Sequence, residues 1–207
     1  MGTKRARNDM SLAIRAINRA ALVNVPVVGP IITELMGFYG DEYKQRQLDA
    51  LAEEMNTVMK LVEGKVDRTF LESDDFAALV MRVMRDSLQT TDRKKVRYLA
   101  AVLAGSATPD RIDPLEVEAI LNAMAQLTST DMVLARAFID QMGKGHNYLE
   151  GDAIPNVGPN PWFHAARLES AGFIERSTNA LPFRTAPYVP TTVLKQLMEM
   201  IGPLLAE

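Results

Sequence analysis

Cysteine is absent from this sequence, and histidine and tryptophan are scarce. Without cysteine the chain has no disulfide framework, no thiol nucleophile and no cysteine-based zinc or iron–sulfur site. The two histidines, His146 and His164, do not belong to the H-x-x-x-H or E-x-x-H pairs typical of metal sites. These absences predict a protein that uses no metal and no cofactor and resides in the cytoplasm, a reducing compartment.

Signatures of catalysis are also missing. The glycines and lysine at 143–151 lack the G-x-x-x-x-G-K-[ST] spacing of a phosphate loop, so a simple loop is the better interpretation. The acidic cluster of Glu72, Asp74 and Asp75 follows the pattern of a helix start, where carboxylates favour the helix dipole. The sequence therefore predicts a protein that is not an enzyme and identifies no small-molecule substrate.

Long hydrophobic runs are lacking as well. The most apolar stretch, residues 20–38, is interrupted by Asn24, Pro26, Pro30 and Glu34. Its uninterrupted runs fall far short of the roughly 20 apolar residues that a membrane span needs. We expect this segment to be a buried strap of a helical bundle. A membrane-acting effector that uses segment 20–38 is the alternative.

What the sequence does contain is helical periodicity. Apolar residues recur at helical spacing over 9–22, and Leu48, Leu51, Met55, Val58 and Val62 form a heptad seam that ends before Gly64. Further helices are predicted to begin near Ser73, near Thr91 or Asp92, at Asp113-Pro114, at Thr128–Asp131, at Asn160-Pro161 and near Thr191. Gly105 to Pro109 and residues 143–161 are predicted loops. The seam favours packing within the chain, and pairing with a second chain stays open.

The C-terminal part has a different pattern. In the helix that ends at Gly172, Trp162, Phe163, Ala166 and Leu168 are expected to face inward. Prolines exclude helix over 177–190, where Leu181, Phe183, Tyr188 and Val189 favour two short strands. The pattern thus predicts a helix, a β-hairpin and a final helix in succession.

This order resembles a winged helix over roughly residues 113–205. The motifs that carry the resemblance are Leu127-Thr128, the stretch RLESAGFI at 167–174 and the proline-flanked ribbon. The segment FLESDDFAALVMRVMRDSLQTTDRKKVRYLAAVLAG at 70–105 resembles small bacterial proteins of unknown function with a helical body and a winged-helix-like tail. The resemblance implies a mainly α fold, with a helical domain at 1–110 and a winged-helix-like domain with a short two-stranded β-hairpin at 111–207.

Basic residues gather in two places. The first is an N-terminal arm that includes Lys4, Arg5 and Arg7, and the second is the cluster Arg93, Lys94, Lys95 and Arg97. Both are candidate contacts to phosphate or to an acidic partner. For the cluster, the favoured interpretation is salt bridging with Asp92, Asp86 or the acids at 72–75.

The winged-helix-like region offers His164, Arg167 and Arg184 as candidate surface residues. Over residues 128–207, however, six lysines and arginines stand against eight acids, a net of −2. Phosphate contacts dominate the affinity of nucleic-acid binders, so this balance favours a protein surface. The sequence therefore predicts a non-enzymatic interaction or adaptor module, bacterial or from a phage, that binds a protein partner or itself. Nucleic-acid binding through the basic arm is the alternative.

Overall fold

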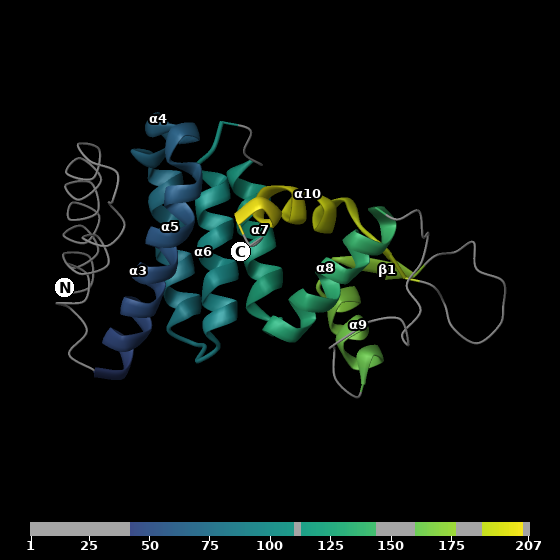
Figure 1. Cartoon of the computed structure of the whole chain (residues 1–207). Helices are drawn as coiled ribbons and strands as arrows, with labels where there is room; N and C mark the ends of the chain where they lie inside the picture. Colours follow the sequence, from purple (N-terminus) through teal and green to yellow (C-terminus); the bar gives the residue numbers. More distant parts are fainter. Residues whose placement is uncertain (1–41, 110–112, 144–159, 177–187, 205–207) are drawn as a thin grey trace, which may run out of the picture. The chain divides into compact units, whose positions relative to one another are not determined.

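Side-chain caps fix where the helices of this chain begin. The computed structural model describes residues 42–109, 113–143, 160–176 and 188–204, which are mainly helical with a small two-stranded antiparallel sheet near the C-terminus (Figure 1). Four capping side chains accept a backbone N–H from the first turn, as predicted: Ser73 for α5 (Asp74–Ser87), Asp92 for α6 (Arg93–Ser106), Asn160 for α9 (Pro161–Ser170) and Thr191 for α10 (Thr192–Ile201).

The chain divides into two compact units, residues 1–118 with 204–207 and residues 119–203. The division falls within α7 (Pro114–Ala125), which begins at the predicted Asp113-Pro114. The predicted boundary between 110 and 111 lies in a segment, 110–112, outside the described residues.

In the first unit α3 (Glu42–Val62) lies beside α5 and α6 (Figure 1). The predicted heptad seam of α3 is confirmed as its core face: Leu48, Leu51, Met55, Val58 and Val62 are all buried. A short 3-10 turn, η1 (Glu63–Lys65), follows at Gly64. The single-turn α4 (Arg68–Leu71), capped by Asp67, was not predicted because one turn carries no periodicity.

The second half of α6 is enclosed on every side. All residues from Leu99 to Ala107 are buried, and most are alanine, glycine or serine. Small side chains allow neighbouring helices to approach closely, which explains an apolar helix without a polar face. The loop predicted from Gly105 is wrong by two residues, because α6 continues through Ser106.

In the second unit α8 (Ser129–Gly143) packs against α9, α10 and the ribbon of β1 (Ile174–Arg176) and β2 (Tyr188–Pro190). The strands pair Ile174 with Pro190 and Arg176 with Tyr188, and the short η3 (Gly202–Leu204) follows α10. The first strand begins before the range predicted from sequence. The expected strand residues Leu181 and Phe183 lie outside the described residues.

The end of α9 is held by a Schellman motif around Gly172. Gly172 has a φ of 77°, its N–H donates to the Glu169 carbonyl at 3.0 Å, and Phe173 N–H donates to the Leu168 carbonyl at 2.9 Å. Phe173 itself is fully buried. This turn gives the carbonyls of Leu168 and Glu169 partners at the helix end, directly before β1.

Several sequence predictions fall on undescribed parts of the chain. They concern the helix at 9–22, the arm with Lys4, Arg5 and Arg7, the apolar segment 20–38, His146 and Arg184. Within the described residues, no helix has both the length and the apolar character required to cross a membrane.

Candidate functional site

The start of α9 presents two aromatic side chains to solvent. Trp162 is 43% exposed and Phe163 is 55% exposed, and Ala166, one turn further on, is exposed as well. The expectation that these three residues face inward is wrong. Only Leu168 of the four predicted inward residues is buried, and Ala165 joins it. Polar contacts determine which side of α9 faces the rest of its unit, and the spacing of hydrophobic residues does not reveal them.

Those contacts converge on Asp131 in the first turn of α8, whose side chain is fully buried. Its Oδ1 accepts the Nδ1 proton of His164 at 2.7 Å, and its Oδ2 lies 3.2 Å from Nε of Arg167. A carboxylate carries no proton to donate, so the hydrogen of this contact resides on the imidazole. His164 and Arg167 of α9 are therefore directed at one carboxylate.

Asp131 also caps its own helix. Its Oδ2 accepts from the backbone N–H of Thr128 at 2.6 Å and from the Thr128 hydroxyl at 2.8 Å, while Asp131 N–H donates back to that hydroxyl at 3.3 Å. This is a reciprocal capping box with aspartate in the place of glutamate. One carboxylate thus fixes both the start of α8 and the face that α9 turns toward it.

Arg167 makes two further contacts that hold α9 in place. Its terminal nitrogen donates to the backbone carbonyl of Gln126, and its guanidinium lies 5.7 Å from the centre of the Phe163 ring. The Phe163 ring in turn meets the His164 ring edge to face, with centres 5.6 Å apart. The exposed Phe163 ring therefore contacts both side chains that bind Asp131.

This arrangement leaves α9 little capacity to hold phosphate. Asp131 pairs with Arg167 and accepts a hydrogen bond from His164, so both side chains have a partner within the unit. The same carboxylate also holds the start of α8. Trp162 and Phe163 are more exposed than the charged side chains beside them, Arg167 at 31% and Glu169 at 33%.

A second polar cluster joins α9 to the ribbon. Nε of Arg176 lies 3.1 Å from Glu169, the Tyr188 hydroxyl donates to Glu169 at 3.3 Å, and the guanidinium stacks 5.8 Å from the Tyr188 ring centre. The nearby Tyr188 phenol, and next the Glu169 carboxylate, raise the pKa of Arg176. Arg176 therefore stays charged and tied to this cluster.

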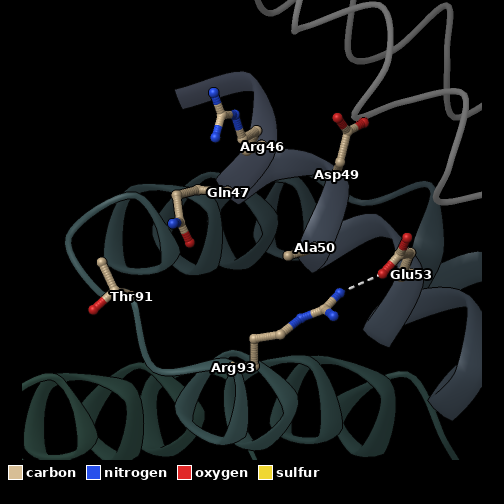
Figure 2. A pocket seen from close by; sticks show the side chains of 7 residues that line it. All are labelled: Arg46, Gln47, Asp49, Ala50, Glu53, Thr91 and Arg93. Atoms are coloured by element: carbon tan, nitrogen blue, oxygen red, sulfur yellow. Dashed lines mark hydrogen bonds and ion pairs between the residues drawn. The ribbon is translucent and has the colours of Figure 1, made fainter. Parts of the chain in front are cut away.

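In the first unit the predicted basic cluster meets acids of α3. Arg93 forms an ion pair with Glu53, which Figure 2 shows reaching across from α6 to α3, and Nε of Arg97 lies 4.0 Å from Glu54. Of the predicted partners, Asp86 contacts Arg82 at 2.7 Å and Asp92 caps α6. Arg93 thus forms a salt bridge, as predicted, but its partner Glu53 lies far from it in the sequence.

The Arg93–Glu53 pair spans a shallow cavity of about 280 Å³ (Figure 2). It is lined by Arg46, Gln47, Asp49, Ala50, Glu53, Thr91 and Arg93. Its two arginines are balanced by two carboxylates, and Arg46 pairs with Glu42 at 2.6 Å. The charges that line the cavity therefore balance, which gives it no net attraction for phosphate.

Arg97 is the least satisfied polar side chain of the described residues. Its Nε and one terminal nitrogen are buried without a hydrogen-bond partner. Glu54, at 4.0 Å, supplies charge but no hydrogen bond. The guanidinium therefore carries a desolvation cost that the pair only partly offsets.

Among the described residues, no three histidine or acidic side chains cluster closely enough to hold a metal ion. Sequence reasoning identified His164 and Arg167 but missed Asp131 as their common partner. Two signals were present: the Thr128-x-x-Asp131 capping box, and the three-residue spacing that puts His164 and Arg167 near one another on a helix. No protein-family model, curated protein or solved structure matches this chain.

Proposed function

We propose that this chain is a non-enzymatic protein-interaction module whose C-terminal unit is winged-helix-like and binds a protein through α9. The succession of α8, α9, the ribbon and α10 follows the order of a winged helix, in which α9 takes the place of the recognition helix. Winged helices serve protein contacts as well as DNA contacts, so the site decides the function.

One observation carries the proposal. The helix that would enter a DNA groove directs His164 and Arg167 to Asp131 and exposes Trp162 and Phe163 instead. Phosphate contacts require unengaged lysine or arginine, whereas exposed aromatics are the residues enriched at protein interfaces. The geometry of α9 therefore favours a protein partner over nucleic acid.

A co-purification experiment tests this function. The full-length chain is immobilised and exposed to nuclease-treated lysate of the organism that encodes it. The wild-type chain is compared with the W162A/F163A double variant and with V193A, a control that shortens another exposed apolar side chain of the same unit. We expect a protein that the wild type and V193A retain and the double variant loses.

Two results would count against the proposal. One is retention of every bound protein by the double variant at wild-type levels. The other is wild-type chain that co-purifies with nucleic acid when the nuclease step is omitted and with no protein when it is included. Circular dichroism of each variant establishes that the helical content is unchanged.

A further inference from the structure

We draw no further inference here: the strongest candidate, the shallow cavity between α3 and the start of α6 that the Arg93–Glu53 pair spans, carries nothing, because its two arginines are balanced by two carboxylates and already form ion pairs within the chain, and nothing in the described residues shows a ligand that it would hold.

Discussion

Asp131 is the side chain on which the orientation of α9 depends. Its removal leaves His164 and Arg167 partly buried without their partner and opens the capping box at Thr128. Breaking a buried ion pair and a helix cap together predicts a loss of about 3 kcal/mol in the free energy of unfolding for Asp131→Ala. Denaturant titration followed by Trp162 fluorescence measures this loss, because Trp162 is the only tryptophan in the chain.

Asp140→Ala is the control for this prediction. It is the same substitution in the same helix at an exposed position, so we expect a change within about 0.5 kcal/mol. A loss at Asp131 no larger than that at Asp140 would mean that the carboxylate does not anchor α9.

Arg97 presents the opposite case, a charged side chain whose burial is poorly compensated. Arg97→Met keeps the length of the side chain and removes the unpartnered buried nitrogens. The cost is the loss of a long pair with Glu54, which is itself 21% exposed. Removing one member of a buried pair leaves the other without its partner, which opposes the gain from removing unpartnered nitrogens, so we expect stability to change by less than about 1 kcal/mol.

Thermal and urea unfolding followed by circular dichroism measures this effect in the first unit, with Arg93→Met as the comparison. Arg93 is 64% exposed and pairs with Glu53, so its loss should cost under about 1 kcal/mol. Destabilisation at Arg97 clearly greater than at Arg93 would show that its contact with Glu54 outweighs its burial.

At the level of secondary-structure elements, replacing either of two glycines at helix ends by alanine is expected to change the stability, in opposite directions. Gly172 has a φ of 77°, and a Cβ added there meets nothing within 4 Å, so Gly172→Ala suffers only from its backbone conformation. The left-handed conformation costs other residues about 1–2 kcal/mol. We expect a loss of about 1 kcal/mol, smaller for Gly172→Asn because asparagine tolerates this region.

Gly202 also has open space at its Cβ position, but its φ of −53° is helical. The same substitution there removes flexibility from the unfolded chain without strain in the folded one. Gly202→Ala should therefore stabilise the second unit by up to about 1 kcal/mol. Trp162 fluorescence during urea unfolding reports both variants, and shifts of the same sign would contradict the assignment of opposite backbone conformations.

Sequence patterns predicted the elements better than they predicted the site. Caps such as Ser73 and Asp92 and the buried seam of α3 are local signals, because each depends on residues within one or two turns. The outward face of α9 is not local. Trp162 and Phe163 are the largest apolar residues of that helix, yet the opposite face lies inward because His164 and Arg167 bind the distant Asp131. For the same reason, hydrophobic periodicity does not predict an ion pair between residues far apart in the sequence, such as Arg93 with Glu53.

For the molecule as a whole, the formal net charge is −3, and two of the candidate phosphate contacts, Arg93 and Arg97, lie beside the acids Glu53 and Glu54. Binding phosphate through Arg93 requires breaking its pair with Glu53, which cancels the gain of a new ion pair. We therefore expect Arg93→Ala to change the affinity for duplex DNA by less than about twofold, since a residue that contacts no phosphate contributes nothing to counterion release.

Mobility-shift titrations of the full-length chain at about 50 mM and about 200 mM salt provide the measurement. The comparison variant replaces Lys4, Arg5 and Arg7 by alanine, because the alternative of nucleic-acid binding through the arm predicts a loss there. If Arg93→Ala lowered the affinity and flattened the salt dependence while the arm variant did not, the pair with Glu53 would open in solution, and the first unit would then be a phosphate-binding surface. An unchanged affinity for Arg93→Ala would show that Arg93 makes no phosphate contact, as expected if the proposed interface on α9 contacts the partner.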